Sequence, residues 1–190
     1  SSGGAFYFGS GVALTDGSGS IKGIFVMTKV TIAICDAITG GAIFIGNANQ
    51  GMVFTDIYIS SAVTFEQGGA MYISSGVNNI YLNTLNIDAC QSGTQGGALY
   101  FGGDQSGVLL KSSSFQNTYS GALGGAIYFK SSITDVTITA CNFTANSASE
   151  SGGALYFNDS VSSVDIDHTS FDRNSAVIDG GAVYIGTGCG

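Results

Sequence analysis

Gly124-Gly125-Ala126-Ile127-Tyr128-Phe129 is the stretch that decides the fold, because versions of it return along the whole chain. The tripeptide Gly-Gly-Ala begins at Gly3, Gly40, Gly68, Gly96, Gly124, Gly152 and Gly180. From Gly40 onward the interval is constant at 28 in sequence number, and the first interval is 37. Self-similarity at a fixed period is the signature of a repeat architecture, in which each unit packs on its neighbours. The sequence therefore predicts a stack of similar units.

Each unit contains three short apolar segments separated by Gly, Ser, Asn and Asp. They are a triplet such as Ile127-Tyr128-Phe129, an alternating pair such as Val136 and Ile138, and one large residue such as Phe143. Short runs with period two are typical of strands and turns, and no helical stripe is sustained. Helical repeats do not fit this pattern, and a propeller blade needs about 40 residues. We predict an all-β chain folded as a right-handed parallel β-helix, a solenoid with about 28 residues and three strands per coil, and coils about 4.8 Å apart.

The 28-residue period divides the chain into coils of a single β-helix segment spanning residues 1–190. The nine extra residues of the first coil are expected in its Gly- and Ser-rich stretch, 9–23. The chain starts and stops within a repeat, so we expect it to be part of a longer repetitive chain, or to stack end to end with other copies. The predicted coils are 3–39, 40–67, 68–95, 96–123, 124–151, 152–179 and a partial coil 180–190.

Composition and charge exclude several partners. The net charge is −8, and the five basic residues do not cluster, whereas binding to a phosphate backbone requires grouped Lys and Arg. Nucleic acids and anionic membrane surfaces are therefore poor candidate partners. No apolar run reaches the roughly 18 residues of a membrane span, so direct membrane insertion is not expected. An apolar content of 44% is too high for a disordered chain.

One aromatic column is the first candidate binding surface. Alternation places Ile127 and Phe129 inside and Tyr128 outside, and the same rule applies to each coil. An outer ladder of this kind can stack on sugar rings or on a neighbouring rod. It can equally reflect β-propensity, stacking between strands, or rings covered by a loop, and with the opposite alternation the ladder would not exist. The predicted ladder is Tyr7, Phe44, Tyr72, Tyr100, Tyr128, Tyr156 and Tyr184.

The corner residues have structural interpretations. The paired glycines are expected where the chain turns into the next strand, because Gly alone adopts positive φ or close packing without penalty. Asn146 and Asn174 occupy equivalent points of successive coils. Asparagines in this arrangement can stack their amides at a bend and tolerate the left-handed conformation.

The combination of Phe-x-x-Asn, at Phe143 to Asn146 and Phe171 to Asn174, with Gly-Gly-Ala-Ile/Leu-Tyr resembles the polymorphic outer membrane proteins of chlamydiae. Similar surface repeats occur elsewhere, including in eukaryotes. The tripeptide covers the whole chain, whereas the full Phe-x-x-Asn motif occurs in two coils only, and 115–117 is shorter by one residue. The resemblance implies β-helical passengers of autotransporters, a secreted or cell-surface location, and adhesion to glycans or to a receptor on a host or other cell.

Cysteines and sequons give weaker indications. Cys35, Cys90, Cys141 and Cys189 lie in alternate coils, so partners within one chain are about 9 to 10 Å apart, which is too far for a disulfide. We expect buried free thiols, with Cys141 inward, and a pairing of Cys189 with another segment stays open. The candidate N-glycosylation sites, in a eukaryotic source, are Asn142, which should face solvent, and Asn158.

The sixth coil contains the only concentration of charge in the sequence. Asp165 and Asp167 alternate with the inward Val164 and Ile166, so both should face outward with Asp172 nearby, where they could hold a calcium ion. Polysaccharide cleavage would need paired carboxylates, or carboxylates with a metal and a base, converging from several coils. The matching positions elsewhere are Tyr81/Asn83, Leu109/Lys111 and Thr137/Thr139, so we interpret the group as a solvated acidic patch. The outer column Thr55, Asn83, Lys111, Thr139, Asp167 is not the regular Thr array of an ice-binding face.

We therefore expect a structural or adhesive module without catalysis, cofactor or metal. The alternatives are a carbohydrate-active enzyme that uses the sixth coil, and a module that binds carbohydrate along the aromatic ladder.

Overall fold

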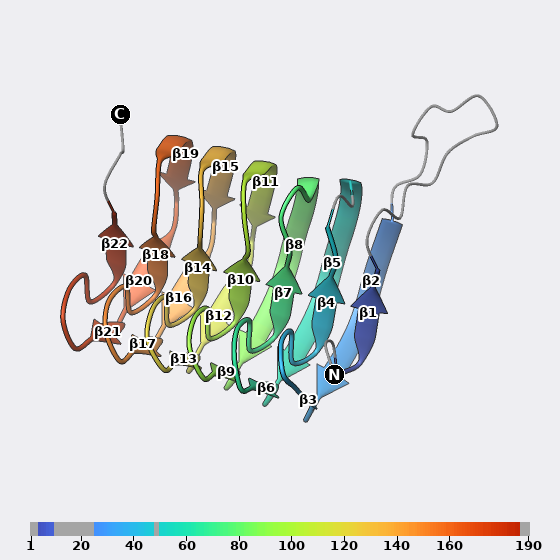
Figure 1. The fold of residues 1–190 in the computed structure, drawn as a ribbon, viewed down its shortest axis with the longest axis horizontal. Coiled ribbons are helices and arrows are strands. Elements are labelled where there is room, and N and C mark those ends of the chain that lie inside the picture. The colour runs from blue at the N-terminus through green and yellow to red at the C-terminus, as the bar shows by residue number, and fades with distance from the viewer. Residues whose placement is uncertain (1–3, 10–24, 48–49, 187–190) are drawn as a thin grey trace.

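The computed structural model describes residues 4–9, 25–47 and 50–186. These residues form strands and turns without any helix, arranged as three parallel sheets that run along a stack of coils (Figure 1). The parallel β-solenoid predicted from the 28-residue repeat is confirmed. The first sheet has the order β1 (Phe6–Phe8), β4 (Ile43–Ile45), β7 (Met71–Ile73), β10 (Leu99–Phe101), β14 (Ile127–Phe129), β18 (Leu155–Phe157) and β22 (Val183–Ile185).

The other two sheets complete each coil. The second contains β2 (Phe25–Ala33), β5 (Gln50–Ser60), β8 (Asn78–Asp88), β11 (Gln105–Lys111), β12 (Ser114–Gln116), β15 (Ile133–Thr139), β16 (Asn142–Thr144), β19 (Val161–Asp167) and β20 (Ser170–Asp172). The third contains β3 (Asp36–Ala37), β6 (Val63–Thr64), β9 (Gln91–Ser92), β13 (Tyr119–Ser120), β17 (Ser147–Ala148) and β21 (Ser175–Ala176).

Strand pairing follows the period of the sequence. Tyr100 pairs with Tyr128, Val108 with Val136, and Ser120 with Ala148, and in each case the partners are one repeat apart. Like residues therefore lie directly above one another, and each coil donates backbone hydrogen bonds to the next. This is the arrangement in which a repeat contacts only its neighbours.

The first coil departs from the period. Phe8 pairs with Ile45, and Phe25 pairs with Met52, so the segment from Phe8 to Phe25 is ten residues longer than the segment from Ile45 to Met52 beside it. The regular spacing of 28 returns where Ile43 pairs with Met71. The segment from Ala37 to Ile43 is therefore one residue shorter than the segment from Thr64 to Met71 beside it. The expansion predicted at 9–23 is therefore in the right interval but comprises ten residues, and 10–24 lie outside the described residues.

The three predicted segments of each coil correspond to the three sheets, with one strand per sheet in coils 40–67 and 68–95. In the next three coils the segment in the second sheet consists of two strands instead of one, and in two of these coils a side chain accepts a backbone hydrogen bond at the corner between them. The Leu85 N–H donates to Ser113 Oγ at 3.0 Å, and the Cys141 N–H donates to Thr169 Oγ1 at 3.3 Å. The residues just before these acceptors, Ser112 and His168, have positive φ and turn the chain.

The core fills the interior of the coils as columns of side chains. Ile127 and Phe129 are buried as predicted, and the rings of Phe115, Phe143 and Phe171 stack at centroid distances of 5.0 and 5.1 Å. The inward column opens to solvent in the sixth coil, where Ile166 is 37% exposed. Ile166 lines a hollow at this end of the stack with Phe157, Val161, Val164 and Ile185.

The corner explains both glycines in coils 40–67 to 152–179, with Gly124 and Gly125 as the example. Gly124 has φ +64°, a conformation that penalises residues with a Cβ. Gly125 faces a different constraint, because a Cβ there would lie 2.1 Å from the carbonyl oxygen of Gly153 in the next coil. The first glycine turns the chain, and the second allows the coils to approach.

Candidate functional site

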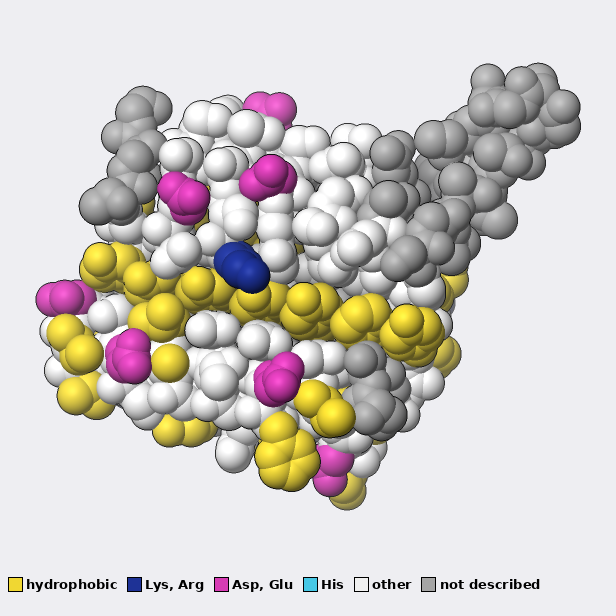
Figure 2. All heavy atoms as spheres, in the orientation of Figure 1, with side chains coloured by type: hydrophobic (Ala, Val, Ile, Leu, Met, Phe, Trp, Pro, Cys, Tyr) yellow, Lys and Arg dark blue, Asp and Glu magenta, His cyan; other side chains and the backbone are white. Residues whose placement is uncertain are grey.

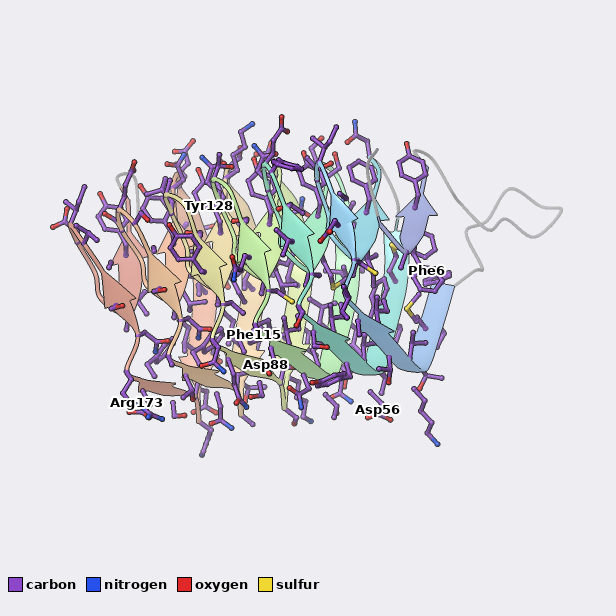
Figure 3. All side chains as sticks on the ribbon, turned by 90° about the horizontal axis from the view of Figure 1, so that it is seen from below. Phe6, Asp56, Asp88, Phe115, Tyr128 and Arg173 are labelled. Atoms are coloured by element: carbon purple, nitrogen blue, oxygen red, sulfur yellow. The ribbon has the colours of Figure 1, made fainter. Side chains whose placement is uncertain are left out.

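The aromatic ladder is a continuous stack on the outer side of the first sheet. Figure 2 shows an unbroken hydrophobic band over these strands, and Figure 3 shows Tyr128 outside the coil and Phe115 within it. Neighbouring rings are nearly parallel, with interplanar angles from 3° to 19°. The centroid distances, in order from Tyr7 to Tyr184, are 5.0, 5.0, 4.9, 5.4, 5.3 and 4.6 Å.

Stacking changes what the ladder offers to a ligand. Tyr7 is 62% exposed, but Tyr100 and Tyr128 are only 4% and 5% exposed. From Gly40 onward the first glycine of the Gly-Gly-Ala tripeptide flanks the ladder; for example, a Cβ on Gly124 would lie 3.0 Å from Tyr128 Cβ. Gly102 lies against the rings of Tyr72 and Tyr100. Because the ring faces cover one another, the inner tyrosines present edges rather than the flat faces that a sugar ring stacks on.

Burial also sets the ionisation of the ladder. Desolvation raises the pKa of Tyr128 to about 12, and the neighbouring Tyr156 hydroxyl adds to the effect. The pKa values of Tyr72, Tyr100 and Tyr156 are raised for the same first reason. The ladder is therefore a neutral, mostly apolar band at physiological pH.

The predicted asparagine stack exists at the inner corner. Asn146 Oδ1 accepts from the Thr118 N–H at 3.1 Å, and Asn174 Oδ1 accepts from the Asn146 N–H at 3.0 Å. The Asn146 amide also donates to Asn174 Oδ1 at 3.0 Å. The asparagines do not use the left-handed conformation that this residue type tolerates, because Ala145 and Arg173 carry the positive φ. The turn comes one residue earlier, which aims the asparagine side chains into the corner.

The expectation of buried free thiols is confirmed for two of the three described cysteines and is wrong for Cys35. Cys90 and Cys141 are fully buried, Cys35 is partly exposed, and none of the three forms a disulfide within the described part of the chain. Burial raises the pKa of the Cys90 thiol to about 12, so it stays protonated and unreactive. Cys189 lies outside the described residues.

Both candidate N-glycosylation sites are on the surface. Asn142 is exposed on β16, as predicted, and its Oδ1 accepts from Ser170 Oγ at 2.7 Å. Asn158 is exposed at a corner, where its amide donates to the carbonyl oxygen of Lys130 at 3.0 Å. Both side chains are accessible at one edge and hydrogen-bonded at the other.

The acidic patch lies on the outer side of the second sheet at the sixth coil, as predicted. Asp165 pairs in register with Thr137, and Asp167 with Thr139, so the preceding coil supplies no carboxylate at these two positions. Asp167 contacts His168 Nδ1 at 2.5 Å, and Asp172 contacts Arg173 Nε at 2.9 Å. Among residues 4–9, 25–47 and 50–186, no three His, Cys, Asp or Glu side chains gather closely enough to hold a metal ion.

Two features were not predicted. Thr64, Ser92 and Ser120 form one inward column in the third sheet, and their hydroxyls are buried with no hydrogen-bond partner within the described ranges. The 28-residue spacing of the two serines could have revealed this column. Separately, Ile34 and Phe65 are 81% and 82% exposed at the first two coils, and only the position of the turns determines that they point outward.

Comparison with known proteins gives no relative. No family model, curated protein or solved structure matches this chain. Within the described residues there is no helix with the length and hydropathy that a membrane span requires.

Proposed function

We propose that this chain is a structural and adhesive module of a secreted or surface protein, and that it works as a rod without catalysis. The observation that carries the proposal is the contrast between inner and outer columns. One inner corner column is Ala in five successive coils, whereas the outer column that includes Lys111 changes at nearly every coil. The repeat therefore keeps the inner residues on which the coils stack constant and varies the outer residues that face solvent. The two columns are Ala42, Ala70, Ala98, Ala126, Ala154 and Thr55, Asn83, Lys111, Thr139, Asp167.

The surface location and adhesive role rest on the resemblance to the polymorphic outer membrane protein repeats. The structure is compatible with that role in one respect, because the outer polar residues are held at the fixed spacing of adjacent strands, about 4.8 Å. We propose glycans or a cell-surface receptor as partners, bound along the varied outer side of the second sheet.

We also propose that another coil packs on the end of the stack, either from neighbouring repeats or from a second copy. Ile166 and Ile185 are exposed around the hollow at the sixth coil, and Phe6 and Tyr7 are exposed at the opposite end. Covering these apolar side chains would be favourable at about 25 cal/mol per Å². A chain extended by one further coil at either end should therefore melt at a higher temperature than residues 1–190.

Adhesion is tested by coupling the chain to fluorescent beads and measuring their retention on a glycan array and on cultured cell layers. The matched control is the same chain with Lys111→Thr and Asp167→Thr, which alters the outer column and leaves the core unchanged. We expect retention of the parent beads and a several-fold loss with the control. Equal retention of both beads, or retention of neither, would refute binding through this surface.

The alternative, polysaccharide binding or cleavage at the sixth coil, is favoured by one observation, the exposure of Asp165, Asp167 and Asp172 on one side of the rod. Its test is depolymerisation of acidic polysaccharides by the parent chain and by Asp165→Asn with Asp167→Asn. Cleavage by the parent that disappears in the double variant would establish the enzyme. The absence of cleavage by the parent leaves the structural role.

A further inference from the structure

Five tyrosines of the ladder are consecutive neighbours, and this has a chemical consequence beyond packing. Tyr72, Tyr100, Tyr128, Tyr156 and Tyr184 follow one another in adjacent coils, with centroid distances from 4.6 to 5.4 Å. The other end differs, because Tyr7 stacks on Phe44, which carries no hydroxyl. The fold thus holds phenol rings next to each other in pairs, and it does so within one chain.

The remaining tyrosines are not paired with another tyrosine in the described strands. Tyr58 pairs in register with Asn86, Tyr81 lies between Val53 and Leu109, and Tyr119 lies between Gln91 and Ser147. Tyr119 is more exposed than most of the ladder, and its hydroxyl contacts Ser149 Oγ at 2.7 Å. The exposed tyrosine Tyr119 has no tyrosine neighbour, whereas the stacked tyrosines of the ladder are mostly less exposed. An experiment can therefore tell whether cross-linking follows solvent exposure or the proximity of two tyrosine rings.

We propose that the ladder is a site of oxidative dityrosine cross-linking between adjacent coils, with Tyr156 and Tyr184 as the first pair to react. Their rings are the closest tyrosine pair of the ladder, at 4.6 Å and 10°, and both are partly exposed, unlike Tyr100 and Tyr128. The proposal goes beyond the structural and adhesive role and does not depend on it.

The chemistry requires a one-electron oxidant, such as a peroxidase intermediate or a photogenerated ruthenium(III) complex. Each phenol gives one electron to the oxidant and one proton to solvent, which leaves two tyrosyl radicals. The radicals couple by forming one carbon–carbon bond between the carbons ortho to the two oxygens. The hydrogen on each coupled carbon then moves to the phenol oxygen through solvent, which restores both aromatic rings. The net change is the loss of two electrons and two protons, and the bond joins two adjacent coils.

The ladder also has a route for reaction at its buried members. Stacked rings at 4.6 to 5.4 Å allow a radical formed at a partly exposed tyrosine to exchange with its neighbour. Tyr100 and Tyr128 should consequently react after Tyr156 and Tyr184, although they are almost inaccessible to a dissolved oxidant. Links formed this way would tie successive coils and raise the melting temperature.

The test uses the whole chain at low concentration, oxidised by light with tris(bipyridine)ruthenium and persulfate. We expect dityrosine fluorescence in a species of monomer size, and a linked peptide pair containing Tyr156 and Tyr184 in the mass spectrum. Tyr184→Phe should remove that link without unfolding the chain, because Phe44 shows that a phenylalanine fits the stack. The matched control Tyr119→Phe should leave the yield unchanged.

A gain-of-function variant keeps the proposal falsifiable. Phe44→Tyr adds only a hydroxyl and should create a new link between Tyr7 and position 44, whose rings are 5.0 Å apart and 8° from parallel. Links confined to Tyr58, Tyr81 or Tyr119, or found only between molecules, would overturn the proposal. So would the absence of a new link in Phe44→Tyr while exposed tyrosines react.

Discussion

At the scale of single residues, the buried polar atoms separate into bonded and unbonded groups. Asn146 is fully buried and uses both ends of its amide, whereas the Ser92 and Ser120 hydroxyls have no partner within the described ranges. A buried polar group without a hydrogen bond costs about 1 to 3 kcal/mol, whereas a bonded one is roughly neutral or favourable. The two groups should therefore respond to substitution with opposite signs.

Replacing Ser92 or Ser120 with Ala should stabilise the chain by about 1 kcal/mol each, because the desolvated hydroxyl is removed. The same column already carries Ala148, which is buried, so alanine fits. The free energy of unfolding in urea measures the change. Ala148→Ser is the reciprocal control and should destabilise by a similar amount, and a loss of stability in both serine variants would mean that ordered water satisfies these hydroxyls.

Asn146→Ala should destabilise the chain by about 3 kcal/mol. The substitution removes the hydrogen bond that the Asn146 side-chain amide donates to the Phe115 carbonyl oxygen at 3.0 Å. It also leaves the buried Thr118 N–H without its acceptor. Urea unfolding again provides the measurement. Asn174→Ala is the matched control and should cost clearly less, because Asn174 is only half-buried. An equal loss of unfolding free energy in the two variants would contradict the view that burial makes the Asn146 hydrogen bonds more important.

At the scale of elements, the corner and the ladder set the tightest limits. Gly125→Ala should destabilise the chain by about 3 kcal/mol or more, because the new Cβ would overlap the Gly153 carbonyl oxygen at 2.1 Å. Gly181→Ala in the last coil should be tolerated, since the nearest described atom, the Asn174 carbonyl oxygen, is 3.6 Å away. Thermal melts of the two variants measure the difference. Equal decreases in melting temperature would show that the cost comes from the lost backbone freedom of glycine and not from the contact with the next coil.

The ladder also predicts how stability depends on pH. Tyr128 has a pKa of about 12 in the folded chain, against 10.0 for an ordinary tyrosine, and the Cys90 thiol has a pKa of about 12 against 9.0. The native state therefore holds more protons than the unfolded state in this range, so stability falls as pH rises. It should be unaffected by these groups up to pH 9, fall above that, and lose about 2 kcal/mol through Tyr128 alone by pH 12.

Circular dichroism melts from pH 7 to pH 12 measure this loss, with tyrosinate absorbance recorded in parallel. Absorbance from the buried tyrosines should appear together with unfolding. Tyr128→Phe should flatten the dependence above pH 10, where its phenol no longer contributes. If all tyrosines ionise while the chain remains folded, the buried phenols of the ladder are accessible to hydroxide, and the predicted link between their ionisation and unfolding is wrong.

The elements also show how far the sequence determines the structure. The inward columns and strand register follow from the 28-residue spacing, because identical residues at one period can pair in only one way. The break between β11 and β12 does not follow, since it depends on Ser113 replacing a backbone acceptor. The positions of the residues with left-handed backbone conformation cannot be predicted from the sequence either. Ala145, for example, has no intrinsic preference for that conformation and is held in it by its neighbours. The burial of Tyr100 does not follow either, because the alternation of a single strand places its ring outside and contains no information about what lies against it, such as Gly102.

At the scale of the whole molecule, the coils are interchangeable. Deleting residues 96–123, one full coil, should leave a folded rod in which Met71 pairs with Ile127, since both occupy the same column. Far-ultraviolet circular dichroism and thermal melting assess the product. Deleting 96–122 instead shifts the register by one residue and exchanges inward and outward side chains, so this control should fail to fold cooperatively. Equal folding of both deletions would contradict a stack held by register.

The irregular first coil shows where this regularity can be relaxed. Ten surplus residues enter between Phe8 and Phe25, yet the pairing partners on both sides of them are already aligned with the second coil. An insertion between two strands that are already paired costs only the modest entropy of closing a longer connection, and the alignment of later coils is unaffected. The connection between β1 and β2 is accordingly the natural place to graft a guest peptide, such as an epitope or a reporter tag, onto the scaffold.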